Sequence, residues 1–60
     1  MFDIIAYHDS VILRIDGNNY MEWDIADFDA IYSSEFPNWQ ELGGAEYEDF
    51  VKFVVSDFFD

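Results

Sequence analysis

The sequence predicts an α+β fold: a three-stranded antiparallel meander, followed by a short helix and a longer C-terminal helix packed on the sheet. Residues 2–25 contain three segments in which every second residue is apolar, which is the pattern of strands with one buried face. After residue 45, apolar residues recur every three or four positions, as in an amphipathic helix. Residues 1–60 are long enough for one small domain.

A β-hairpin is predicted around the sequence DGNN, because an alternating segment lies on each side of it. These segments are residues 11–15 and 20–25. Each has apolar residues at every second position, so each presents one apolar face. We expect both faces to pack on the core: Val11, Leu13, Ile15, Met21, Trp23 and Ile25.

The predicted loop of this hairpin has three residues. The two apolar faces lie on the same side of the sheet if Ile15 lies opposite Met21. A two-residue loop between regular strands would turn one face to solvent. We therefore expect Asp16 and Tyr20 to close the loop, with Asn19 in the left-handed conformation.

The same argument predicts a first strand in residues 2–8, joined to the second by a tight turn at Asp9-Ser10. The core-facing residues of this strand are then Phe2, Ile4 and Ala6. In this register Arg14 lies opposite Glu22. The other face of the sheet is expected to carry Asp3, Ile5, Tyr7, Ile12, Arg14, Tyr20, Glu22 and Asp24.

The remaining residues read as helical. Asp24 or Asp27 can cap a short helix that continues to Tyr32. In the connection that follows, one helical turn is expected to begin at Pro37 and to end at the Gly43-Gly44 pair. The clearest helix follows this pair, and its predicted core-facing residues are Tyr47, Phe50, Val51, Val54 and Phe58.

The composition combines a foldable core with an extreme charge. Thirteen aromatic residues (seven Phe, four Tyr and two Trp) supply packing surface, and the absence of cysteine excludes disulfides and thiolate metal sites. Fourteen carboxylates face only Arg14 and Lys52, which gives a net charge of −12. Solubility requires a charge magnitude of only about 2 to 8 in a small domain. The excess indicates a function for the acids.

Two groups of acids are candidate partner-binding residues. On the last helix, four acids and one phenylalanine share a face opposite the apolar one; we call it the acidic stripe, and it consists of Glu46, Asp49, Phe53, Asp57 and Asp60. The second group, the acidic cluster, consists of Glu22, Asp24, Asp27, Asp29 and Glu35. A solvated face with one exposed Phe is the alternative interpretation of the stripe, and helix capping accounts for one or two acids of the cluster.

Several other functions fit the sequence poorly. The segment DGNNYMEWD lacks the sixth-position glycine and twelfth-position glutamate of a calcium loop, so no metal site or cofactor is expected. His8 has no nucleophile or second histidine to act with, so the chain is not expected to be an enzyme. Nucleic-acid binding requires basic residues, and a membrane span requires about 20 apolar residues. With no secretion signal visible, we expect a soluble cytoplasmic protein.

In size, charge and predicted architecture the chain resembles the small acidic inhibitors that phages make against host nucleic-acid enzymes. These include DNA-mimic anti-CRISPR proteins, anti-restriction proteins and uracil-DNA glycosylase inhibitors. The segment DGNNYMEWDIADFDAIY is similar to the turn, strand and acidic Phe-bearing helix of the glycosylase inhibitors. The residues DSV (9–11) resemble the Glu-Ser-Ile stretch of one such family.

The resemblance and the charge together predict a DNA-mimic inhibitor, in the first place an anti-CRISPR protein. Its expected partner is the basic surface with which a CRISPR effector reads PAM-containing target DNA. One alternative is inhibition of a uracil-DNA glycosylase or a restriction enzyme. Another is an immunity or antitoxin protein, or a plain interaction module, that neutralises a basic partner. The sequence does not determine the oligomeric state.

Overall fold

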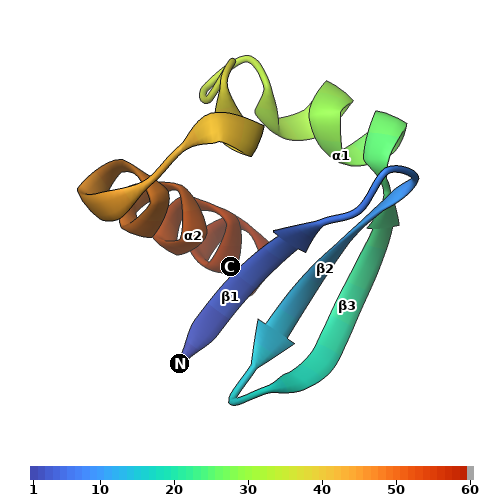
Figure 1. The fold of residues 1–60 in the computed structure, drawn as a ribbon, viewed down its shortest axis with the longest axis vertical. Helices are drawn as coiled ribbons and strands as arrows, with labels where there is room; N and C mark the ends of the chain where they lie inside the picture. The colour runs from blue at the N-terminus through green and yellow to red at the C-terminus, as the bar shows by residue number, and fades with distance from the viewer. Residues whose placement is uncertain (60) are drawn as a thin grey trace.

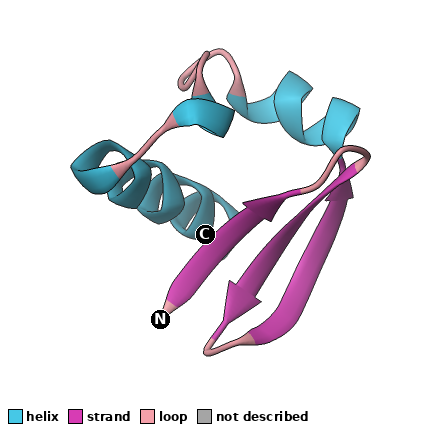
Figure 2. Cartoon of the chain, in the orientation of Figure 1, coloured by secondary structure: helices cyan, strands magenta, loops and turns pink. Residues whose placement is uncertain are grey.

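The computed structural model describes residues 1–59 as a sheet covered on one side by helices (Figure 1). Strands β1 (Phe2–Ala6), β2 (Ser10–Ile15) and β3 (Asn18–Asp24) form an antiparallel sheet in the order β1-β2-β3. Helix α1 (Ile25–Tyr32), the short 3-10 helix η1 (Trp39–Glu41) and helix α2 (Gly44–Phe59) follow, as Figure 2 shows by element type. The predicted fold class is confirmed.

The first hairpin turns one residue earlier than predicted. The Tyr7 N–H donates to the Ser10 carbonyl at 2.7 Å, so the turn residues are His8 and Asp9. Ile4 consequently lies opposite Leu13. A slip of two residues keeps every side chain on its predicted face, which is why the apolar pattern could not distinguish the two registers.

The second hairpin has a two-residue turn, so the predicted three-residue loop is wrong. Asp16 and Gly17 both have positive φ, 52° and 84°, as in the type I′ turn that Asp-Gly favours. Ile15 lies opposite Asn18, yet Leu13 lies opposite Met21. The register shift between these pairs is a β-bulge, and its extra residue restores the apolar faces that a two-residue loop alone would have turned apart.

The bulge also changes the surroundings of Arg14. The predicted pairing of Arg14 with Glu22 is wrong, because Glu22 lies opposite Ile12 and Arg14 lies opposite Asn19. The Arg14 guanidinium instead donates to the Gly17 carbonyl at 2.8 Å and holds the turn. The side chain thus stabilises the backbone without neutralising a carboxylate.

Helix α1 begins where the sequence predicted. Asp24 is its N-cap, with the extended backbone (φ −63°, ψ 142°) of that position but without a side-chain capping hydrogen bond. Its carboxylate therefore acts on the helix through charge alone. The predicted turn after Pro37 is the 3-10 helix η1, and α2 begins at Gly44, whose φ is +59°.

The core lies between the sheet and the helices, and the described part of the chain buries no charged side chain. Helix α2 contributes Phe50, Val51 and Val54, as predicted. The prediction for Phe58 is wrong, because its side chain remains 37% exposed near the end of the helix. Phe2 and Ala6 were also expected in the core, but they are exposed at the two ends of β1. The whole buried set is Ile4, Val11, Leu13, Phe28, Tyr32, Trp39, Phe50, Val51 and Val54.

Among residues 1–59, none of the helices has both the length and the apolar character needed to cross a bilayer.

Candidate protein-binding surface

The acids lie on the outside of the molecule. Of the fourteen, Asp60 falls outside the described residues; twelve of the other thirteen are exposed and Asp3 is half-buried. Within residues 1–59 the ion pairs join the N-terminal amine to Asp16 and, when the histidine is protonated, His8 to Asp9. Neither Arg14 nor Lys52 pairs with a described carboxylate. The negative charge therefore faces solvent with almost no internal compensation.

Three elements position the acidic cluster. Glu22 lies on β3, the next three acids lie at the start of α1 or within it, and Glu35 follows the helix; all five are exposed. Asp29 accepts a hydrogen bond from the Trp39 indole N–H at 2.9 Å and so ties α1 to η1. The other four make no side-chain hydrogen bond within residues 1–59, which leaves them available to a partner.

The acidic stripe also contains one acid that hydrogen-bonds within the protein and others that do not. Asp57 accepts a hydrogen bond from the Tyr32 hydroxyl at 3.0 Å, which joins α2 to α1. Glu46 and Asp49 are exposed and make no such contact in the described part of the chain. Asp60 lies outside the described residues.

Phe53 is less free than the sequence predicted. It is 39% exposed, and its ring packs edge-on against Phe36 and Tyr32, with centroid distances of 5.3 and 6.2 Å. The Phe53 side chain therefore covers part of the contact between α1 and α2. Contact of its exposed part with a partner stays a prediction.

Sequence reasoning missed an exposed aromatic group where the end of α2 crosses the sheet. Tyr20, the extra residue of the bulge, was expected on the open face. Its ring instead meets Phe58 and Phe59 at centroid distances of 5.8 and 5.6 Å, and Phe59 meets Phe2 at 6.3 Å. Aromatic side chains are enriched at the centres of protein interfaces. The Phe58-Phe59 pair was the one sign of this group in the sequence. Its contact with Tyr20 depends on the bulge, which the sequence did not predict.

Tyr32, which hydrogen-bonds to Asp57 of the acidic stripe, makes the stability of the fold depend on pH. Burial, and then the hydrogen bond to Asp57 and the charge of its carboxylate, raise the pKa of Tyr32 from 10.0 to about 12. The folded state thus holds this proton more tightly than the unfolded chain does. The resulting stabilisation is complete below pH 10.0 and is lost as pH rises through about 12.

We therefore expect the free energy of unfolding to fall between pH 10 and 12, in the window set by the Tyr32 pKa. Chemical denaturation at a series of pH values measures this fall. In the Tyr32→Phe variant the part due to this proton should be absent, although the variant is less stable at neutral pH. An equally steep fall in both proteins would contradict the role of Tyr32.

Within residues 1–59, no three His, Cys, Asp or Glu side chains are arranged to hold a metal ion. A cleft of about 570 Å³ lies between β1 and α2, and its lining is mainly apolar but includes Asp3, Glu48 and Lys52. Comparison of the chain with family models, with curated proteins and with solved structures gives no match in any of the three.

Proposed function

We propose that this protein is a DNA-mimic inhibitor that occupies the basic DNA-binding surface of another protein, in the first place a CRISPR effector. The observation that carries the proposal is the set of exposed carboxylates that no cation neutralises within residues 1–59. Self-repulsion among such charges destabilises a folded chain. A basic partner surface would relieve this repulsion on binding.

The fold supports mimicry because it holds the acids on rigid elements. Neighbouring acids on a helix face lie roughly 5 to 6 Å apart. Phosphates on one DNA strand rise about 3.4 Å each along the axis, and the path around the helix makes their separation about twice that. A row of helical carboxylates can therefore meet the lysines and arginines that otherwise contact successive phosphates. Glu46 and Asp49 are three residues apart on α2, the separation that produces this spacing on a helix face, and their side chains make no hydrogen bond within residues 1–59.

The proposal predicts that the purified protein prevents target-DNA binding by a CRISPR effector. The measurement is retention of labelled PAM-containing DNA by each of a panel of effectors, with and without the protein. Inhibition should weaken steeply as salt increases, because the contact depends on opposite charges. Unimpaired DNA binding across the panel would remove this function.

The same surface also suits the DNA-binding groove of a uracil-DNA glycosylase or a restriction enzyme. Assays of uracil excision and of restriction cleavage, with the same protein preparation, separate these targets from a CRISPR effector. A protein that neutralises a basic toxin would leave all three activities intact and would rescue growth of cells that express the toxin.

A further inference from the structure

The outer edge of β1 presents backbone hydrogen-bonding groups that β2 does not use. The hydrogen bonds from Tyr7 N–H to Ser10 and from Asp16 N–H to Met1 mark residues 1 and 7 as bonded toward β2. In an antiparallel pair this role alternates along the strand. The N–H and C=O groups of Phe2, Ile4 and Ala6 consequently point to the outer edge.

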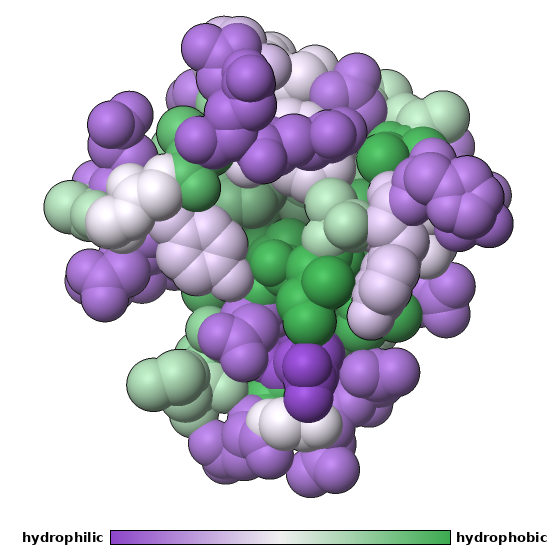
Figure 3. Space-filling view, viewed as in Figure 1, coloured by the Kyte–Doolittle hydropathy of each residue, from purple (hydrophilic) through white to green (hydrophobic). Residues whose placement is uncertain are grey.

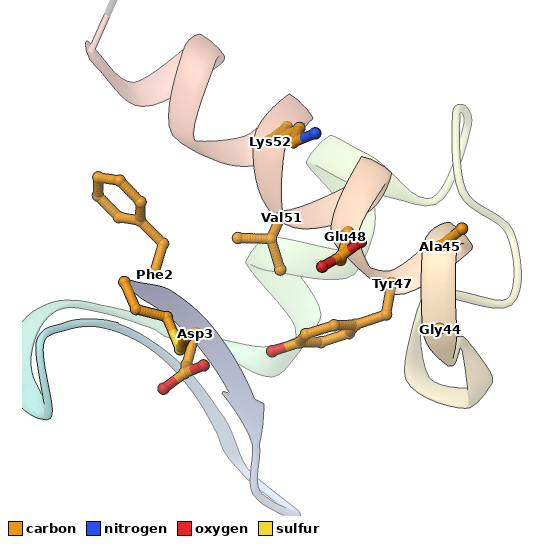
Figure 4. A pocket seen from close by; sticks show the side chains of 9 residues that line it. Phe2, Asp3, Gly44, Ala45, Tyr47, Glu48, Val51 and Lys52 are labelled. Atoms are coloured by element: carbon orange, nitrogen blue, oxygen red, sulfur yellow. The ribbon is translucent and has the colours of Figure 1, made fainter.

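Two clefts run along this edge. The larger lies between the start of β1 and α2, with Phe2 on one side and Val51 on the other, as the close view shows (Figure 4). The second, about 280 Å³, lies beyond Tyr47 and includes Ala6 and Leu42 in its lining. Figure 3, in the orientation of Figure 1, shows apolar surface in the middle of the view, surrounded by hydrophilic side chains.

Tyr47 separates the two clefts and occupies the middle of the edge. Its hydroxyl accepts a hydrogen bond from the Ile4 N–H at 3.0 Å and donates one to the Ile4 carbonyl at 3.2 Å. These are the two bonds that a neighbouring strand would make to Ile4. One phenol thus takes the place of a strand at the centre of β1, while no hydrogen bond from elsewhere in residues 1–59 reaches the outward backbone groups of Phe2 and Ala6.

We propose that this edge receives an extended, basic peptide segment, which pairs with β1 as a fourth strand and displaces the Tyr47 hydroxyl. Addition of a strand to an exposed edge is a common mode of peptide recognition. The charge selects the occupant: a chain of net charge −12 repels acidic segments and a second copy of itself. At the larger cleft the N-terminal amine of Met1 is paired with Asp16, which leaves Asp3 and Glu48 against Lys52 alone, so lysine or arginine side chains fit its mouth.

This site is separate from the faces assigned to DNA mimicry and does not depend on that function. The acidic stripe and the acidic cluster act through side-chain charge, whereas the β1 edge acts through backbone groups. Loss of peptide binding at the edge would leave the inhibition of DNA binding untested, and the reverse also holds. The two proposals can therefore fail independently.

The test titrates isotope-labelled protein with a capped peptide of alternating valine and lysine and follows the backbone amides by NMR. We expect the amide signals of Phe2, Ile4 and Ala6 to shift and the exchange of these amides with solvent to slow. The same peptide with glutamate in place of lysine should leave them unchanged. Because exchange is measured in the unaltered protein, this readout does not depend on any variant folding.

The matched variants are Ala6→Pro and Ala6→Val. Proline removes the outward N–H and no bond to β2, whereas valine retains it, and the net charge is the same in both. Peptide affinity should be roughly threefold to tenfold lower for the proline variant than for the valine variant. Equal affinities of the two variants would overturn the proposal. So would signal changes confined to the acids of α1 and α2. A dimer of the chain in sedimentation would also overturn it, because a second copy and not a basic peptide would then occupy the edge.

Discussion

Replacing Phe28 with alanine is expected to leave the chain largely unfolded at room temperature. The Phe28 side chain is fully buried, and its ring lies 4.6 to 5.1 Å, centroid to centroid, from those of Trp23, Tyr32 and Trp39. Loss of a buried phenylalanine costs about 3 to 5 kcal/mol. A domain of this size has a total stability of roughly 3 to 9 kcal/mol, at about 0.05 to 0.15 kcal/mol per residue.

The effect should be large because Phe28 joins every layer of the molecule. It lies on α1 and contacts Trp23 of β3 and Trp39 of η1, and its ring also meets Phe50 of α2 at 6.0 Å. The cavity left by alanine would be bordered by aromatic rings, which are too stiff to close over it. The free energy of unfolding would fall with no compensating contact.

Near-ultraviolet circular dichroism and a thermal melt measure this loss. The control is Ile31→Ala, which changes the same helix at a side chain that is 51% exposed. We expect this control to change stability by less than about 1 kcal/mol. A cooperative melt of Phe28→Ala close to that of the control would mean that the core tolerates the cavity and that this account of it is wrong.

The sequence predicted the strand faces well because a period of two survives changes of register. Ile4, Val11 and Leu13 are buried although both hairpins pair differently from the prediction. Register depends on turn geometry as well as on the apolar pattern. The Asp16-Gly17 turn favours two residues, and a bulge reconciles that turn with the apolar faces. No periodicity in the sequence marks the bulge.

The candidate site was predictable in part, because its exposure follows from composition but its internal contacts do not. The charge excess predicted that acids cover the surface, and twelve of the thirteen described acids are exposed. The sequence did not reveal that Asp29 binds the Trp39 indole or that Asp57 binds the Tyr32 hydroxyl. These contacts join elements 10 and 25 residues apart and depend on how the helices pack. They determine which acids can be changed without disturbing the fold.

Reversing Glu46 and Asp49 to lysine should weaken partner binding strongly, whereas the loss of a favourable charge in the first turn of α2 should cost only about 1 kcal/mol of folding stability. Both side chains are exposed on α2 and make no hydrogen bond within residues 1–59. Close charge pairs across an interface couple by about 1.5 kcal/mol or more, so two reversals should lower affinity roughly a hundredfold or more. The measurement is affinity for whichever effector or enzyme the unaltered protein inhibits, at several salt concentrations.

A matched control separates the position of the charges from their number. The double variant Asp9→Lys/Glu41→Lys also changes the net charge from −12 to −8, since each reversal adds two, but it lies outside both candidate groups. In the acidic cluster, Glu22 and Glu35 are the better pair to reverse, because a lysine at Asp24 or Asp27 would oppose the dipole of α1.

The two double variants distinguish a direct contact through the acidic stripe from an attraction that depends only on the net charge of the protein. A contact through the acidic stripe requires that Glu46→Lys/Asp49→Lys lose far more affinity than the control, with a shallower dependence on salt than the unaltered protein. Equal losses would mean that the partner responds to total charge, as in electrostatic steering, and that the stripe is not the contact. Unchanged inhibition by every double would exclude the acidic surface as the site, and binding would have to rest on the exposed aromatic residues around Tyr20.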